Sequence, residues 1–505
     1  MKKILFLLLI VVAGLLGGCK KFLEEKPFSF LSPANFPTNA QEADIALRGV
    51  YAIMQGREEY EGFDRRMFDY TLPGALSISN DIIDGSAFFT MNEGRGQRYT
   101  DPSFTAFYLG INSANTLIAA LEGKTEPWVE AKVAEARAIR ALYYFYLVRM
   151  FSDVPLKLTP TTSATEKYSR TPVPEIYNQI VEDLTFAEDK LPNRADPDGR
   201  ITMGGCKGIL AQVYISMAGF YRTPEGQNVS ITNDATKYWG LAREKAQEIL
   251  NMGVYTLASD YTQVFKDLTT DVYNNEILFD IPFSWHGGGD VGAGFPLIYG
   301  PADETGGDGT RGGGKYGILP VLVEWVRELE PGDERVPWNI ATYLYRTNTW
   351  DEVPYTDSTQ WNLAKFRKWP YGVDGGGWMT FSTNFPVVRL SEIKLILAEA
   401  ENELNGPASA YQHVNDIRIR AGLPALPSGL SKDNLRDKII AERAIELCGE
   451  AKRHFDLVRW GIFKQKMDSR KLSSWVQDHG GVDESYINTF IPQSEIDKNG
   501  WTQNK

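Results

Sequence analysis

Residues 128–155 constrain the fold of this chain more than any other stretch, because they have the pattern of one long buried helix. The apolar residues that recur at the spacing of one helical face are Ile139, Leu142, Tyr143, Tyr146, Leu147 and Met150. Ala134, Ala138 and Ala141 form a narrow stripe of small residues beside them, which would let another helix approach closely. We therefore expect a core helix against which other helices pack.

Helical periodicity recurs on both sides of this stretch. The further predicted helices are 41–54, 103–122, 173–190, 204–220, 236–251, 388–404, 408–421, 431–448 and 451–464. Gly406 and Pro407 mark a tight turn, so that the pair around them spans about 34 residues, the tetratricopeptide period. Such hairpins bury their apolar faces only by stacking on one another. The sequence thus predicts a mainly α fold, a tetratricopeptide-like helical stack.

Two segments, at about 57–100 and 255–383, interrupt the helical pattern. The first is polar and has few periodic apolar positions. The second contains glycine runs and seven of the twelve tryptophans, which are Trp285, Trp325, Trp338, Trp350, Trp361, Trp369 and Trp378. We expect both segments to be loop-rich, and loops of this kind often carry binding residues.

The first nineteen residues have the pattern of an export signal. Lys2 and Lys3 precede the apolar run 4–16, which is shorter than the ~20 residues needed to span a bilayer. No later stretch comes close to that requirement, so no transmembrane helix is expected. Residues 16–19, Leu-Gly-Gly-Cys, resemble a bacterial lipobox, in which the cysteine receives a diacylglycerol. This reading divides the chain into a signal peptide (1–18), a lipidated tether (19–35) and a folded domain (36–505); the alternative is an ordinary cleaved signal with an incidental cysteine.

Composition and motif spacing argue against several classes of function. The formal net charge of −12 makes nucleic acid an improbable partner, because phosphate binding needs clustered Lys and Arg. The run 307–315 resembles a glycine-rich phosphate loop, but Tyr316 stands where Ser or Thr would bind magnesium.

The four histidines have no metal-ligand spacing. We therefore expect no cofactor and no metal, and buried free thiols at Cys206 and Cys448 rather than a disulfide.

Glu442, Glu446 and Glu450 share one helical face and are followed by Arg453, Asp456 and Arg459. A glycosidase needs two carboxylates about 5–9 Å apart across a sugar, and neighbours on one helix rarely face each other across a cleft. We favour a salt-bridge network over a catalytic pair, and so expect no catalysis.

Many ordered motifs of the chain resemble the SusD/RagB family of nutrient-binding lipoproteins of Bacteroidetes-type bacteria. The motifs are CKKFLEEKP at 19–27, RGVYA at 48–52, EARAIRALYYFYLVRMFSDVPL at 135–156, PVPEIYNQIVEDL at 172–184, NNEILF at 274–279, VVRLSEIKLILAEAENELNG at 387–406, HVNDIRIRAGLP at 413–424, ERAIELCGEAKRHFDLVRWG at 442–461 and IPQSEID at 491–497. Ala451 departs from the family, since a glycine is common at its position.

The resemblance implies four tetratricopeptide-like units and a more irregular remainder that carries the ligand site. It also implies capture of nutrients, chiefly glycans, by a protein that is lipid-anchored to the cell outer membrane, faces the outside and partners a SusC-like TonB-dependent transporter. A glycan-cleaving enzyme and a helical-repeat scaffold that binds only proteins or peptides stay open as alternatives.

The two loop-rich segments supply the residue types that an oligosaccharide ligand requires. Sugar C–H bonds sit on the faces of indole rings, and sugar hydroxyls need Asp, Asn or Arg to replace lost water. The stacking candidates are Trp285, Trp350, Trp361 and Trp378, and the polar candidates are Asp84, Asn92, Arg95 and Arg98. Trp325 follows an apolar run and is expected in the core. In proteins of this resemblance the ligand lies on the loop-rich face, so we expect the segments 57–100 and 285–381 to meet there.

The lipobox makes Cys19 the predicted membrane anchor. Two or three acyl chains, at ~0.8 kcal/mol per buried CH₂, would hold the protein on a membrane essentially permanently. Cys19→Ala should therefore leave the chain unmodified and move it from the membrane fraction to the soluble fraction. Retention of a correctly processed Cys19→Ala variant in the membrane fraction would contradict the lipid anchor.

Overall fold

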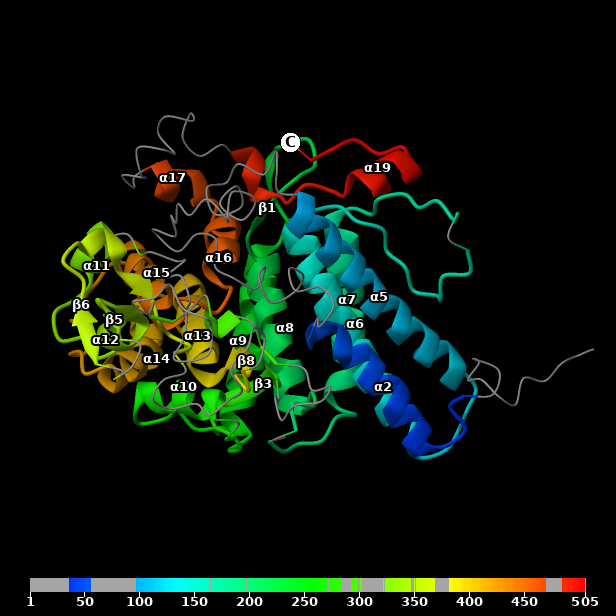
Figure 1. Cartoon of the computed structure of the whole chain (residues 1–505), viewed down its shortest axis with the longest axis horizontal. Helices are drawn as coiled ribbons and strands as arrows, with labels where there is room; N and C mark the ends of the chain where they lie inside the picture. Colours follow the sequence, from blue (N-terminus) through cyan, green and yellow to red (C-terminus); the bar gives the residue numbers. More distant parts are fainter. Residues whose placement is uncertain are drawn as a thin grey trace, which may run out of the picture.

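The computed structural model shows a stack of helices with a loop-rich half packed beside it (Figure 1). The structure describes residues 36–55, 97–163, 165–195, 198–270, 272–283, 292–293, 295–297, 300–301, 321, 323–346, 349, 351–367, 381–468 and 484–504.

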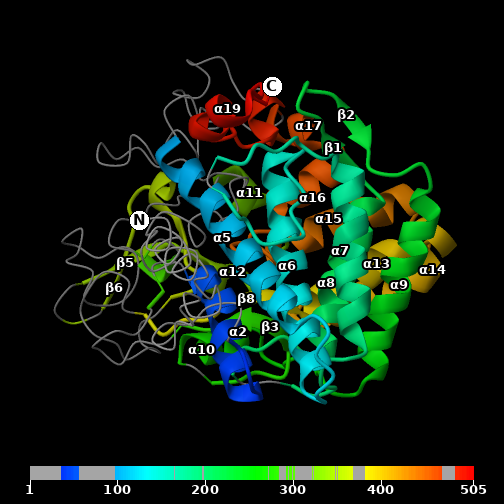
Figure 2. The same cartoon turned by 90° about the vertical axis from the view of Figure 1, so that its right-hand side faces the viewer.

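Helices that follow one another along the chain pack side by side to form the stack, as Figures 1 and 2 show. In chain order they are α2 (Ala40–Gln55), α5 (Gln97–Leu121), α6 (Val129–Phe151), α7 (Val173–Glu188), α8 (Met203–Met217), α9 (Ala235–Asn251), α13 (Leu390–Asn405), α14 (Pro407–Arg420) and α15 (Lys432–Glu446). The loop-rich half is inserted between α9 and α13, which nevertheless pack directly against each other. The mainly α, stacked fold expected from the periodicity is confirmed.

Helix α6 lies at the centre of the first half of the stack and contacts α2, α5, α7 and α8. Ala134, Ala138 and Ala141 are fully buried, as the small-residue stripe predicts. The close approach of α5 to α6 depends on Gly110, since a Cβ there would lie 2.4 Å from Cε2 of Tyr143. The Tyr143 hydroxyl donates to the Val50 carbonyl of α2 over 2.5 Å. The helix is therefore a central packing element for four neighbouring helices.

The loop-rich half contains short helices and short antiparallel strand pairs. Its elements are α10 (Tyr261–Thr269), β3 (Ile277–Ile281), η4 (Phe295–Leu297), α11 (Val323–Glu328), α12 (Val336–Asn339), β4 (Ile340–Ala341), β5 (Tyr343–Tyr345), β6 (Glu352–Pro354), η5 (Ser358–Gln360), β7 (Asn362–Leu363) and β8 (Phe385–Arg389). Strand β3 pairs with β8, with Ile277 opposite Arg389 and Ile281 opposite Phe385. Because α13 begins directly after β8, this pair joins the loop-rich half to the stack.

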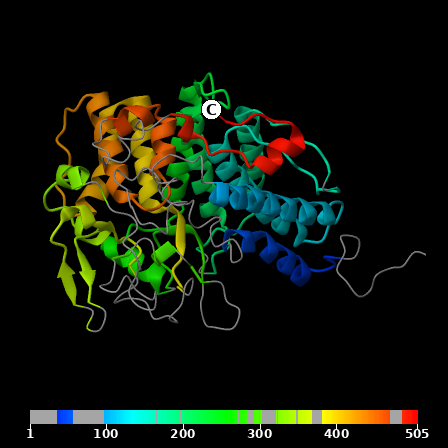
Figure 3. The same cartoon turned by 45° about the horizontal axis from the view of Figure 1, so that its top comes forward.

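The remaining elements lie at the end of the molecule that carries the C-terminus (Figure 3). They are β1 (Phe220–Arg222), β2 (Asn228–Ser230), α16 (Arg453–Arg459), α17 (Phe463–Asp468), η6 (Glu484–Ile487) and α19 (Gln493–Asn499). Strand β1 pairs with β2 and also contacts α16.

Two sequence-based boundaries are wrong. Helix α5 begins at Gln97, so residues 97–100 are helical although they were assigned to the first loop-rich segment. The single helix expected over 451–464 is two short helices, because Gly461 has φ +68°. Ala451 precedes them with φ +56°, in the left-handed region that favours glycine, which gives a physical reason for the family's glycine at this position.

Residues 103–121 of α5 are long and apolar enough to cross a membrane, contrary to the expectation that no stretch after the signal approaches this requirement. Half of this stretch is buried within the protein. Its apolar side packs against α2 and α6, as in a core helix of a folded domain.

A buried group of charged side chains, which we call the Glu446 cluster, ties the loop-rich half to the stack. Its members are Glu276, Arg335, Lys365, Arg389, Arg420, Glu442, Glu446 and Glu450. Glu446 lies 2.6 Å from Arg420, 3.1 Å from Arg389 and 3.2 Å from Arg335. A salt-bridge network around Glu442, Glu446 and Glu450 is present, as expected. Its cations include Arg335, Lys365, Arg389 and Arg420, whereas Arg459, which follows the glutamates along the chain, pairs instead with Glu399 and Asp456.

The partners of these glutamates come from separate parts of the loop-rich half. Arg389, the last residue of β8, lies 2.6 Å from Glu276 before β3 and 2.7 Å from Glu450. Lys365 lies 2.5 Å from Glu450 and donates to the Glu446 carbonyl over 2.8 Å. Burial alone would raise the pKa of Glu446, but Arg420, Arg389 and Arg335 outweigh burial and hold it well below its usual range. The folded state thus requires the ionised carboxylate.

Glu446→Gln should lower the free energy of unfolding by about 3–5 kcal/mol, because it leaves buried arginines without their shared anion. A carboxyl group with a depressed pKa stabilises the fold above its ordinary pKa of 4.5, and this stabilisation is lost as the pH falls below it. The acid-induced loss of stability should therefore be shallower in the variant. Urea denaturation across a pH series measures both effects.

Glu244→Gln, at an exposed position of α9, is the matched control and should change stability by no more than about 0.5 kcal/mol. If Glu446→Gln unfolds at the same urea concentration as wild type and shows the same acid profile, the structural role assigned to Glu446 is wrong.

Candidate functional site

A cluster of buried phenylalanine rings lies beside the β3–β8 pair. Phe295 is central, with its ring centroid 6.1 Å from that of Phe283, 5.1 Å from Phe366 and 5.5 Å from Phe385. These contacts are edge-to-face, a favourable geometry for aromatic pairs. Phe265 of α10 completes the cluster, 5.7 Å from Phe366. Residues from five separate places in the loop-rich half therefore share one apolar base.

The phenylalanine cluster rests directly on the Glu446 cluster. Lys365 Nζ lies 4.6 Å from the centre of the Phe265 ring, and the Arg389 guanidinium carbon lies 5.4 Å from it. Both cations can interact with the negative face of the ring while they pair with Glu450. The charged layer and the aromatic layer thus hold each other in place.

Hydrogen bonds bring the ends of the loop-rich segments together next to this base. The Gln55 side chain, at the end of α2, donates to the Pro282 carbonyl over 2.6 Å. The Phe283 amide donates to the Asn384 side chain over 2.9 Å, and the Ala293 amide donates to the Phe381 carbonyl over 2.7 Å. The segments 56–96, 284–291 and 368–380 therefore start or end at residues that are bonded to one another.

A second link holds the chain on either side of Trp361. The Val321 amide donates to the Trp361 carbonyl over 2.8 Å, which fixes the end of 302–320 beside residues that lead into 368–380. Trp361 is half-buried and packs against the main core.

Arg367 holds the β5–β6 hairpin at the start of 368–380. Its guanidinium carbon lies 4.7 Å from the Trp338 ring, and Nη1 donates to the Tyr343 hydroxyl over 2.6 Å. Its Nε donates to the Ala364 carbonyl over 3.1 Å. Burial raises the pKa of Tyr343 well above its usual range, so this phenol stays protonated. Because the guanidinium is surrounded by oxygen acceptors and an indole, Arg367 supports the loop rather than reaching for a ligand.

Of the sequence-based stacking candidates, the structure describes only Trp361. Trp285, Trp350, Trp378, Asp84, Asn92, Arg95 and Cys19 lie outside the described residues. The backbone of Arg98 belongs to the first turn of α5, and its side chain lies outside the described part. Trp325 is 5% exposed and belongs to the core, which confirms its exclusion from the candidates.

Sequence reasoning concentrated on tryptophans and missed the tyrosines and the arginine around the hairpin. Tyr343 and Tyr345 are buried next to each other, with ring centroids 5.4 Å apart, and the Tyr355 hydroxyl accepts from Asn362 over 3.1 Å. The alternation Tyr-Leu-Tyr over 343–345 was the available signal, since it is typical of a strand with one buried face.

The groups that would suggest catalysis are engaged in structural contacts. Glu442, Glu446 and Glu450 pair with buried cations. Burial lowers the pKa of His454 to about 4, so this histidine is neutral at physiological pH. Cys206 and Cys448 are buried free thiols, as expected. Within the described ranges, the acidic, histidine and cysteine side chains form no group of three that could hold a metal ion.

Comparisons with family models identify two matching regions. Residues 333–503 match the model of the SusD family, and residues 21–215 match a model described as "Starch-binding associating with outer membrane". Together these regions include most of the helical stack and the second part of the loop-rich half.

Similar proteins match over nearly the whole chain. Two from Formosa agariphila are SusD-like protein P25, 24% identical over 95% of this chain and 94% of its own, and SusD-like protein P2, 28% identical over 90% of each. A solved SusD homolog from Bacteroides thetaiotaomicron superposes with a TM-score of 0.77 at 24% identity, covering 94% of this chain and 98% of that one. A laminarin-binding SusD-like protein superposes with a TM-score of 0.69 at 25% identity, covering 92% and 98%.

Substitution of two tryptophans separates a ligand contact from a core contact. Trp361→Ala should weaken oligosaccharide binding about two- to tenfold, because the half-buried ring keeps one part open for stacking. Trp325→Ala should instead lower the free energy of unfolding by about 3–5 kcal/mol, because it truncates a core side chain. Thermal unfolding and titration calorimetry on the same samples measure both. Unchanged affinity in a well-folded Trp361→Ala variant would remove Trp361 from the site.

Proposed function

This chain belongs to the SusD/RagB family, and from that premise we propose that it captures oligosaccharides at the cell surface and delivers them to a SusC-like TonB-dependent transporter. In this proposal the loop-rich half binds the glycan and Cys19 carries the lipid anchor in the outer membrane.

The glycan-binding part of the proposal rests on one observation: hydrogen bonds hold the ends of separate segments together beside the phenylalanine cluster. Gln55, Phe283 and Phe381 stand at the ends of three different segments, and each is hydrogen-bonded within the same region. Segments that start from one rigid base can present their side chains to one ligand, and a rigid base limits the entropy lost on binding. We propose that Trp285, Trp350, Trp361 and Trp378 stack on sugar rings there, and that Asp84, Asn92, Arg95 and Arg98 bind sugar hydroxyls.

The proteins similar to this chain guide the choice of ligand. One similar structure is described as laminarin-binding, and one matching family model is described as starch-binding. Laminarin and starch are both glucans, so we propose a glucan as the first ligand to test.

The contacts of the charged residues favour glycan binding without cleavage. The carboxylates Glu442, Glu446 and Glu450, which share one helical face, are held in the Glu446 cluster, where each pairs with a cation. Groups committed in this way cannot act as a general acid and a nucleophile across a sugar without breaking buried ion pairs. The carboxylates of the Glu446 cluster therefore do not support the enzyme alternative.

Titration calorimetry of a soluble form that begins after Cys19 tests this function against laminarin, starch, neutral non-glucan oligosaccharides and peptides. We expect saturable binding of at least one glucan, and product analysis after prolonged incubation should return that glucan intact. Binding of peptides alone would favour the scaffold alternative. Cleavage products that disappear in an Asp or Glu variant would favour the enzyme alternative.

A further inference from the structure

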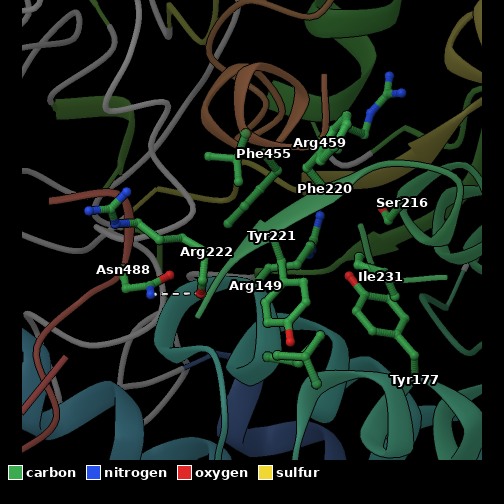
Figure 4. A pocket seen from close by; sticks show the side chains of 13 residues that line it. Arg149, Tyr177, Ser216, Phe220, Tyr221, Arg222, Ile231, Phe455, Arg459 and Asn488 are labelled. Carbon is green, nitrogen blue, oxygen red and sulfur yellow. Dashed lines mark hydrogen bonds between the residues drawn. The ribbon is translucent and has the colours of Figure 1, made fainter. Parts of the chain in front are cut away.

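A small pocket lies where the ends of α6 and α8 meet the start of α7, strand β1 and α16 (Figure 4). Its polar lining includes Arg149, Tyr177, Ser216, Arg222, Arg459 and Asn488. The cavity volume is about 30 Å³, enough for one or two water molecules or for the few atoms of an acid group, but not for a sugar ring. The exposed ring of Phe220 also lines it.

Two aromatic rings hold the Arg149 guanidinium in a fixed position. Its central carbon lies 3.6 Å from the centre of the Phe145 ring and 4.1 Å from the centre of the Phe455 ring. Its Nε donates to the Phe145 carbonyl over 3.0 Å. Among the described residues, no acceptor bonds to either Nη atom, and no carboxylate forms an ion pair with Arg149. A half-buried guanidinium thus presents its planar, unpaired edge to the pocket.

The other charged side chains that line the pocket are already paired. Arg459 lies 2.7 Å from Glu399 and 2.8 Å from Asp456, and Arg222 lies 3.3 Å from Glu484.

Behind the pocket, Glu392 pairs with Lys452 at 3.0 Å and lies 3.6 Å from Arg443, which also pairs with Asp456. Within this group of side chains, Arg443, Lys452 and Arg459 each have a carboxylate partner, whereas Arg149 forms no ion pair with a described carboxylate.

Local structure only partly stabilises this charge. The carbonyl end of α6 favours a cation, but the bond to Phe145 uses Nε and leaves both Nη atoms available. Burial lowers the pKa of the Arg149 guanidinium, and nearby tyrosines and carboxylates only partly offset this effect. An anion in the pocket would supply the missing compensation.

We propose that this pocket is a binding site for a single carboxylate group, held by Arg149. A carboxylate matches the planar fork of a guanidinium, which can donate two parallel hydrogen bonds to it. The carboxylate belongs either to a small free acid or to an acidic sugar whose ring stays in the mouth of the pocket. This site is separate from the proposed glucan site, and neither depends on the other.

The test is calorimetry and thermal unfolding with sodium acetate, sodium glucuronate and neutral glucose at constant ionic strength. Wild type should show saturable binding of a carboxylate and no response to glucose. Arg149→Gln should weaken the carboxylate affinity by at least about tenfold, because a charge-assisted hydrogen-bonded pair is lost. Arg243→Gln, which removes a positive charge from α9 away from the pocket, is the control and should leave the affinity unchanged.

A further variant covers the case in which Arg149→Gln does not fold. Arg149→Lys keeps the charge without the planar fork and should weaken binding several-fold. Binding of both acetate and glucuronate identifies a general carboxylate site, and binding of glucuronate alone identifies an acidic sugar as the ligand. The proposal is overturned if wild type binds neither acid, or if the affinity is the same in the folded pocket variants as in Arg243→Gln.

Discussion

Glu446 is completely buried and shared by three arginines, and the position of the loop-rich half depends on this contact. A buried carboxylate is stable only when cations and hydrogen-bond donors surround it in a definite geometry. Arg389 comes from β8, Arg335 from the start of α12 and Arg420 from the end of α14. Each element must therefore return to one point on α15, and alternative packings of 333–367 would leave charges buried without partners. This requirement favours one packing of the loop-rich half over others, which its short strands alone would not do.

The proposed site is built outward from that contact in layers. The Glu446 cluster supports the phenylalanine cluster, since Lys365 and Arg389 both approach the Phe265 ring. The phenylalanine cluster in turn holds Phe283, Phe295 and Phe366, which lie near the ends of separate segments. A variable set of ligand-binding side chains can change without disturbing this base. In this arrangement, the residues that stabilise the fold are different from those that determine ligand specificity.

The sequence predicted the stack well because its signal is local. In α6, apolar side chains recur at helical spacing, and the alanine stripe on the same helix is fully buried as expected. The carboxylate face of 442–450 also predicted an ion-pair network. Its partners Glu276, Arg335 and Lys365 could not be predicted, because they come from distant positions with no periodic pattern. The same holds for Arg367 and Tyr343, whose contact depends on the folding of a hairpin. The end of the helix before Gly461 was not predicted, because the spacing of apolar residues carries no information about a positive φ.

Hydrogen–deuterium exchange of the Glu450→Gln variant tests the central claim most directly, because Glu450 contacts only Lys365 and Arg389 among the cations of the Glu446 cluster. If the cluster positions the loop-rich half, amides of 333–346, 351–367 and 385–389 should lose protection, while those of α5, α6 and α7 keep it. Equal loss of protection in the stack and the loop-rich half, or no loss in either, would contradict the account.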